Sequence, residues 1–166
     1  MTRAVHNPLS RRAFSIIELT LIIAIIGIMA SMALPRFSGS LMRGRADAAA
    51  RRVSADIALA QNLARQASAS RSIEFFIGSG TYRLPGVSDP DRPGTDYLVR
   101  LAQSPYEARL SEASFAGESV LTFDGYGVPD SAGTVVLQVG SEQRTLTVEA
   151  HSGRVTISEA NVAPVN

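Results

Sequence analysis

The chain has 166 residues, a formal net charge of +1 and no cysteine. Its composition excludes a disulfide-stabilised domain, and its length allows about one globular domain. Residues 1–71 carry ten arginines against three carboxylates, a net charge of +7. Residues 72–166 carry six arginines against twelve carboxylates, a net charge of −6. The sequence therefore predicts a basic N-terminal part and an acidic C-terminal part, which either attract one another between neighbouring molecules or serve only solubility.

A short basic stretch at the N-terminus leads directly into a long apolar one. The segment 14–34 follows paired arginines and holds a single carboxylate, Glu18. A helix of about 20 residues measures about 30 Å, which is enough to cross a bilayer. Residues 14–35 are therefore predicted to form a transmembrane helix. An ionisable side chain inside such a helix is costly, so Glu18 is expected to have a function.

The start of the apolar stretch resembles the processing site of the type IV pilin and pseudopilin superfamily. In that superfamily a small residue precedes a Phe, and a Glu follows four residues later; here these are Ala13, Phe14 and Glu18. The resemblance implies that a prepilin peptidase removes the leader 1–13 and methylates the new amine of Phe14. It also implies that Glu18 pairs with the amine of a neighbouring subunit during filament assembly.

Two helix-weakening residues follow in register with the same superfamily. Gly27 lies within the apolar segment and Pro35 at its end. Gly27 and Ser31 also have the small-xxx-small spacing that permits close contact between helices in lipid. The resemblance implies that this stretch loosens when subunits pack into a filament.

The same N-terminal residues allow a second interpretation. The paired arginines before Phe14 also fit a twin-arginine export signal, and residues 31–33 fit a signal-peptidase site. A soluble periplasmic binding domain would then begin at Leu34. Glu18 would interrupt the hydrophobic region of that signal, and the region exceeds the usual length of about 7–15 residues. The sequence therefore favours a helix that is retained.

The segment 36–71 has the period of an amphipathic helix. Apolar residues recur in it at spacings of three and four, as expected for one buried face. They are Val53, Ile57, Ala60, Ala64 and Ala67. We expect this face to pack against the rest of the protein.

From Ser72 the hydrophobic period changes from 3.6 to 2, which is typical of half-buried strands. Strands are predicted at 72–77, 97–101, 135–139, 145–149 and 155–157. Glycine-containing turns separate them, so we expect about six to eight antiparallel strands in one or two sheets. The predicted fold class is α+β and pilin-like. A long N-terminal helix, transmembrane and then amphipathic, packs on an antiparallel β-sheet or sandwich head at 72–166.

This order of one long helix followed only by strands resembles the GspH/FimT pseudopilin group. The segments 123–129 and 152–155 resemble the C-terminal pattern of that group. The resemblance implies a structural protein rather than an enzyme: a minor pseudopilin of a type II secretion system. Such a subunit works at or near the tip of the periplasmic pseudopilus and promotes protein export. The alternative is a FimT-like minor type IV pilin that serves pilus assembly or DNA uptake.

The resemblance also implies a location and partners. The chain would cross the bacterial inner membrane once, with a cytoplasmic leader and a periplasmic head. Its partners would be the prepilin peptidase, the inner-membrane assembly platform and the other major and minor pseudopilins. The head would contact those pseudopilins or the secreted cargo, and no cofactor is expected.

Few residues of the head suggest chemistry. His151 lies in a predicted turn, and no nucleophile elbow or metal-binding pair accompanies it. Asp89, Asp91 and Asp96 lie in one predicted loop, where three carboxylates can bind Ca²⁺ if they converge. Their spacing differs from an EF-hand and also fits an ordinary turn.

A contact with DNA requires clustered basic side chains on the surface. Arg144 and Arg154 are the candidates, because they are predicted to lie across a terminal hairpin from one another. The net charge of −6 over residues 72–166 argues against nucleic acid as a partner.

Overall fold

The structure, a computed structural model, describes the backbone of residues 15–160 and the side chains of residues 15–31 and 39–159. The chain divides into two compact units, with the boundary between Gly39 and Ser40. The described residues form one helix and eight strands: α1 (Ile16–Ala67), β1 (Arg71–Phe76), β2 (Thr81–Ser88), β3 (Asp96–Arg100), β4 (Arg109–Phe115), β5 (Val120–Phe123), β6 (Gly133–Val139), β7 (Glu142–Val148) and β8 (Val155–Ala160). This composition confirms the predicted α+β class.

The helix α1 is 52 residues long and ends before the predicted boundary at residue 71. Ser68 follows it with a left-handed backbone, φ 47°. The N–H of Ala69 donates to the carbonyl of Ala64 at 3.2 Å. A left-handed residue after the last turn and a bond of this type are the usual way in which a helix ends.

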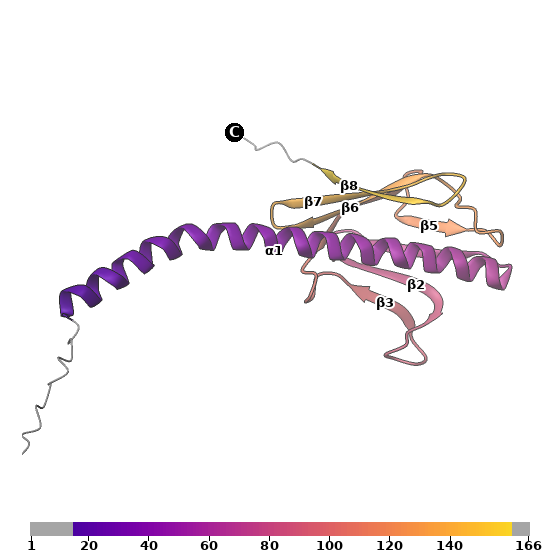
Figure 1. The fold of residues 1–166 in the computed structure, drawn as a ribbon. Coiled ribbons are helices and arrows are strands. Elements are labelled where there is room, and N and C mark those ends of the chain that lie inside the picture. The colour runs from indigo at the N-terminus through magenta and orange to yellow at the C-terminus, as the bar shows by residue number, and fades with distance from the viewer. Residues whose placement is uncertain (1–14, 161–166) are drawn as a thin grey trace, which may run out of the picture. The chain divides into compact units, whose positions relative to one another are not determined.

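The strands form two antiparallel sheets of four, with the orders β3-β2-β1-β5 and β4-β6-β7-β8. The strands β4 and β5 are exchanged between the sheets. β5 pairs with β1 although β4 lies between them in the sequence, and β4 pairs with β6 although β5 lies between them. In Figure 1 the part of α1 within the second unit has β2 and β3 on one side and β6, β7 and β8 on the other. Both sheets therefore pack against the same helix.

The predicted apolar face of α1 is the face that the sheets bury. Val53, Ile57, Ala60 and Ala64 are at most 1% exposed, whereas Ala67 is exposed because the helix ends there. They belong to one apolar core with side chains from both sheets: Ile73, Phe75, Tyr82, Leu121 and Phe123 from the first, and Leu137, Leu146 and Val148 from the second.

Three strands of the head, β2, β4 and β5, were not predicted from the sequence. In β2 the register with β3 shifts between Leu84 and Ser88, around Pro85. In β4 the register with β6 shifts between Leu110 and Glu112. A bulge breaks the alternation of apolar and polar side chains, and β5 has only four residues. None of the three therefore has a period long enough to detect.

We expect that Ala60→Leu destabilises the head and that Ala58→Leu does not. Ala60 is 1% exposed in the core, so a larger side chain must displace its neighbours, at a cost of about 1–3 kcal/mol. Ala58 lies on the exposed face of the same helix and serves as the matched control. Urea denaturation followed by circular dichroism measures both, and equal midpoints for the two variants would contradict the packing described here.

Candidate functional site

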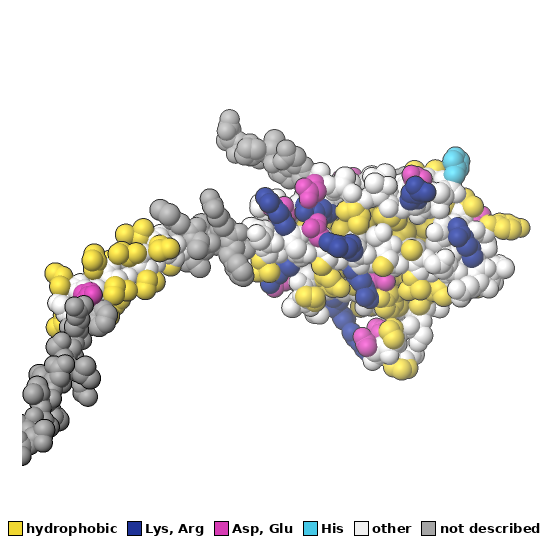
Figure 2. All heavy atoms as spheres, viewed as in Figure 1, with side chains coloured by type: hydrophobic (Ala, Val, Ile, Leu, Met, Phe, Trp, Pro, Cys, Tyr) yellow, Lys and Arg dark blue, Asp and Glu magenta, His cyan; other side chains and the backbone are white. Residues whose placement is uncertain are grey.

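The first turn of α1 carries the carboxylate that the sequence singles out. Glu18 is exposed, and it is the only ionisable side chain among residues 15–31. Large apolar side chains surround it and are exposed too, including Ile16 at 82% and Ile17 at 76%. Figure 2 shows these hydrophobic side chains and one acidic group near the start of the helix. An apolar surface of this extent requires cover by lipid or by another protein.

The processing site itself, Ala13 and Phe14, lies outside the described residues. Among the residues that the structure does describe, no helix is long and apolar enough to cross a membrane. The predicted span 14–35 includes residues whose side chains lie outside the described set, and it stays a prediction.

The two predicted helix-weakening positions both lie within α1. A Cβ added to Gly27 would meet no atom within 4 Å. Nothing in the described chain therefore requires glycine there, and a close approach at this position would have to come from another molecule. The side chain of Pro35 is outside the described set, so its predicted role is untested.

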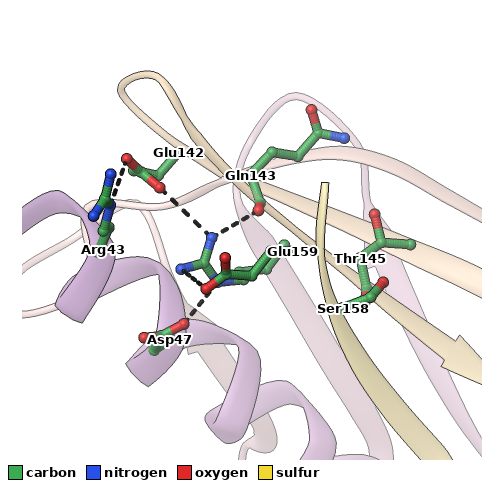
Figure 3. Close-up of polar contacts among 8 residues, drawn as sticks. Arg43, Asp47, Glu142, Gln143, Thr145, Ser158 and Glu159 are labelled. Carbon is green, nitrogen blue, oxygen red and sulfur yellow. Dashed lines mark hydrogen bonds and ion pairs between the residues drawn. The ribbon is translucent and has the colours of Figure 1, made fainter. Parts of the chain in front are cut away.

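A buried arginine connects the helix to the second sheet. Arg144 of β7 is 3% exposed, and its Nε donates to Oδ1 of Asp47 on α1 at 2.6 Å. Its other nitrogens lie 3.2 Å from Glu159 and 3.7 Å from Glu142. Figure 3 shows these three carboxylates converging from α1, β7 and β8. We call Arg144 and the three carboxylates the Arg144 cluster.

The Arg144 cluster overturns one of the predicted DNA contacts. Burial by itself lowers the pKa of Arg144, but the hydrogen bond to Asp47 and the nearby carboxylates outweigh it, so the pKa is raised. The side chain stays charged, and its charge is neutralised inside the protein. It is therefore not available to a phosphate, whereas Arg154 is exposed.

A second polar cluster lies between α1 and the first sheet. Asp56 is 5% exposed, although it stands in the apolar face of the helix next to Ile57. Its Oδ2 accepts from Tyr82 Oη at 2.5 Å and from Arg52 Nε at 3.1 Å. Tyr97 Oη lies 3.3 Å from Oδ1 and also accepts from Arg52. A carboxylate that interrupts an apolar stripe was the sequence signal for this site, and the sequence prediction did not use it.

Burial and the charge and hydrogen bond of Asp56 raise the pKa of Tyr82. The pKa of Tyr97 is raised as well, first by burial and then by Asp56. Both phenols therefore keep their protons at pH values where a solvated tyrosine would lose its own.

The three aspartates proposed for calcium do not converge. Oδ1 of Asp89 accepts from the N–H of Asp91 at 2.9 Å, and Oδ1 of Asp96 accepts from the N–H of Gly86 at 3.0 Å. Among the described residues, no group of three His, Cys, Asp or Glu side chains is placed to hold a metal ion. The calcium prediction is therefore wrong for this geometry, because the carboxylates of Asp89 and Asp96 are held by backbone N–H groups of two different segments. His151 is exposed in the turn before β8.

Residues 49–153 match the sequence model of a family described as type II transport protein GspH. The chain belongs to the GspH family. Its fold is similar to two crystal forms of the type IV minor pilin FimU from Pseudomonas aeruginosa strain PAO1, with TM-scores of 0.50 and 0.52. Sequence identity is 13% in both, over 69% and 72% of this chain and 97% and 95% of FimU. That likeness shows the fold alone. No curated protein matches the sequence.

The GspH match and the N-terminal motif are separate observations. The matched segment 49–153 covers residues 49–67 of α1 and the head as far as the turn before β8. The motif at Ala13, Phe14 and Glu18 lies outside it. The family and the pilin-like fold confirm the resemblance found from the sequence.

Stability should fall at alkaline pH through Tyr82. Because its pKa is raised by folding, its contribution is complete below the unfolded pKa of about 10 and is lost as the pH rises above it. The expected loss is about 1.4 kcal/mol per pH unit for each such tyrosine. The chain has no Lys or Cys, so no other type of side chain titrates near this range.

Tyr82→Phe should reduce this alkaline slope and also cost about 1 kcal/mol at pH 7, since Asp56 loses one donor. Urea midpoints of the variant and the native chain between pH 8 and pH 11 measure both effects. Identical slopes would show that Tyr82 does not keep its proton.

Arg144→Met should destabilise the head by about 1–3 kcal/mol, because Asp47 and Glu159 then lose their cation and Glu142 keeps only Arg43. The cost should stay below that of a fully buried pair, since the side chains of Asp47 and Glu159 are 37% and 78% exposed. Arg154→Met is the control and should change stability by less than about 0.5 kcal/mol. If the Arg144→Met protein were as stable as this control, the ion pairs of Arg144 would not stabilise the head and the prediction would be wrong.

Proposed function

We propose that this member of the GspH family is a minor pseudopilin of a type II secretion system. The observation that supports it most is the combination of a GspH head with an exposed apolar helix that carries Glu18 in its first turn. A helix with this surface is suited to packing with other helices, in lipid first and in a filament afterwards. The head, which shows no metal-binding cluster among its described residues, then acts by binding other proteins.

The assembly mechanism follows from the chemistry of Glu18. A carboxylate surrounded by apolar side chains is costly unless a cation pairs with it. Cleavage between Ala13 and Phe14 would create a new amine about one helical turn from Glu18 in the same chain. A pair formed within one subunit needs no neighbour, so it would not favour assembly. The methylated amine of a neighbouring subunit would instead neutralise Glu18 only when the two helices have the correct register. Pairing of this kind guides each subunit into the filament.

This function implies a location and a set of partners. Before assembly the chain would be held in the inner membrane by residues 14–35, with the leader in the cytoplasm and the head in the periplasm. The prepilin peptidase and the inner-membrane assembly platform would act on the N-terminal part. The head would contact other pseudopilins or the secreted cargo, at or near the tip of the pseudopilus.

A minor type IV pilin is the second candidate, and the similarity of fold to FimU supports it. Both candidates use the same N-terminal chemistry and differ in the machine that the subunit joins. Co-purification distinguishes them, because the native partners would be pseudopilins in one case and type IV pilins in the other. DNA uptake has little support, since Arg144 is buried among carboxylates.

Glu18→Ala should leave the protein in the membrane fraction but strongly reduce its co-purification with other pseudopilins. The apolar surface that holds the helix in lipid is unchanged, whereas the partner of the neighbouring amine is lost. Thr20→Ala is the matched control, because Thr20 lies in the same exposed part of α1 and, among the residues that the structure describes, its hydroxyl bonds only to the carbonyl of Ile17, at 2.9 Å. Unchanged co-purification of Glu18→Ala would contradict the proposed role.

The mass of the mature N-terminus tests the processing step separately. A protein extracted from native membranes should begin at N-methylated Phe14. A protein that begins at Leu34 and is free in the periplasm would instead be the product of an export signal, and the helix would then play no part in assembly.

A further inference from the structure

The loop that follows β5 is held in one conformation by hydrogen bonds. Oδ1 of Asp124 accepts from the N–H groups of Tyr126 and Val128, at 2.9 and 2.8 Å. From α1, Arg65 Nε donates to the carbonyl of Tyr126 at 3.1 Å. We call residues 124–128 the tyrosine loop. Its backbone is fixed both by its own aspartate and by the helix.

The two glycines of the tyrosine loop lie against the end of the helix. A Cβ on Gly125 would lie 2.8 Å from the backbone of Ser68, and a Cβ on Gly127 would lie 2.2 Å from the side chain of Arg65. Gln61 of α1 donates to the carbonyl of Gly127 at 2.7 Å. The loop therefore cannot change its conformation without losing these contacts.

The larger side chains of the same loop are exposed. Tyr126 is 86% exposed and Val128 is 39% exposed, and neither belongs to the core of the head. The fold therefore explains the glycines of the loop but not its tyrosine. A large aromatic side chain on a preorganised loop is typical of the residues that dominate protein interfaces.

A guanidinium lies beside this tyrosine. The Nε of Arg65 is bonded to the loop, which leaves its terminal nitrogens for a partner. Within the described part of the chain, no carboxylate lies within ion-pair distance of Arg65. We call the tyrosine loop together with Arg65 the Tyr126 surface. An open groove of about 550 Å³ adjoins it and is lined by Arg65, Ser68, Asp124, Gly125 and Tyr126.

The C-terminal residues of the chain are too few to cover this surface. Glu159, near the end of β8, belongs to the Arg144 cluster and lies at the level of Asp47 on the helix. From Asp47 to Arg65 the helix rises about 27 Å. The segment 161–166 reaches about 20 Å when it is fully extended. The occupant of the Tyr126 surface is therefore another molecule.

The groove beside Arg45 argues against a second copy of the chain as that molecule. Its lining is polar and consists of Glu107, Arg109, Gln138 and Gly140. The glutamate is already paired with Arg45, and the glutamine already donates to a backbone carbonyl. The arginine of the groove would repel Arg65. This groove therefore offers neither an apolar pocket for the ring nor a free carboxylate.

The place of the Tyr126 surface indicates which kind of protein reaches it. Arg65 lies in the last turn of α1, and the compact unit that contains the head begins at Ser40. The helix rises about 37 Å between these residues. If all subunits of a filament point their N-terminal ends to the membrane, this end of the head faces a subunit that lies farther from the membrane.

The rigidity of the loop favours a fixed partner over a variable one. Preorganised side chains gain affinity for one partner because little freedom is lost on binding. Proteins that bind many partners use flexible surfaces instead. A filament subunit is a fixed partner, whereas secreted cargo is a transient one.

We propose that the Tyr126 surface docks onto the head of a different filament subunit, the neighbour on the side away from the membrane. The ring of Tyr126 fills an apolar pocket of that subunit, and Arg65 pairs with an Asp or Glu at the rim of the pocket. This inference rests on the proposed function for the common direction of the subunits. It adds the residues that make the contact and the chemistry that the partner must offer.

A photoreactive amino acid tests the contact in native cells. The full chain with p-benzoylphenylalanine in place of Tyr126 should form one predominant adduct with another filament subunit on illumination. Mass spectrometry should place the cross-link in the head of that subunit, in a peptide that contains Asp or Glu. The same amino acid in place of Thr156, which is exposed on β8, is the control and should not give this adduct.

Two variants of the arginine separate its charge from its bond to the loop. Arg65→Lys and Arg65→Gln both remove the Nε donor, but only the lysine keeps the charge. In the chain with the photoreactive residue, Arg65→Gln should lower the yield of the adduct about tenfold, and Arg65→Lys should keep most of it. Equal yields from the two variants would overturn the pairing with a carboxylate.

The ring is tested without the photoreactive residue. Tyr126→Ser should lower co-purification of the same subunit about tenfold or more, as the loss of an aromatic anchor does, whereas Tyr126→Phe should keep most of it. Ile77→Ser is the control, because Ile77 is also exposed, at 53%, but lies beyond the other end of β1. Circular dichroism of each purified variant checks that it is folded.

Three outcomes overturn the inference. They are the absence of an adduct from folded chains, an adduct only with secreted cargo or with a second copy, and co-purification that Tyr126→Ser leaves unchanged. An adduct with a minor type IV pilin would support the inference and contradict the proposed membership of a secretion system. The failure of one proposal is thus distinguished from the failure of the other.

Discussion

The close approach of α1 to two sheets at once is the constraint on which the head depends. The helix face at this contact consists mainly of alanine, with Ala46, Ala49, Ala50, Ala60 and Ala64 all at most 1% exposed. Such small side chains let the helix backbone come near the inner faces of both sheets, so that one core serves all three elements. In a chain without disulfides, this shared core has to supply most of the stability.

Apolar packing alone does not set the position of such a helix. An alanine face repeats at every turn, so a helix shifted by one turn would bury nearly the same surface. The bonds from Tyr82 to Asp56 and from Arg144 to Asp47 favour one position, since each joins α1 to a different sheet with directional geometry. A shifted helix would break both bonds and leave Asp56 and Arg144 with fewer partners, which is costly for buried charged groups. The polar clusters thus select among arrangements that the apolar core would tolerate.

Two parts of the described chain differ in what they bury. Residues 16–31 expose apolar side chains around Glu18 and have no core of their own, whereas the head is folded around the second half of α1. Membership of the GspH family rests on the head, and the prepilin motif lies outside the matched segment. In the proposed function, the N-terminal helix brings subunits together and the head determines what they contact.

The sequence by itself determined the long helix, its buried face from Val53 to Ala64, and the strands whose alternation is regular. These depend on local period, which side-chain order alone specifies. It also determined that Glu18 is the single charge at the start of an apolar segment. Only the tertiary structure decided the strands β2, β4 and β5, because bulges and short length remove their period. It also decided that Arg144 is buried, because the carboxylate closest to it in space, that of Asp47, is 97 residues away in the sequence. Pairings over such distances depend on how the sheets close around the helix, and no local pattern of residues encodes that closure.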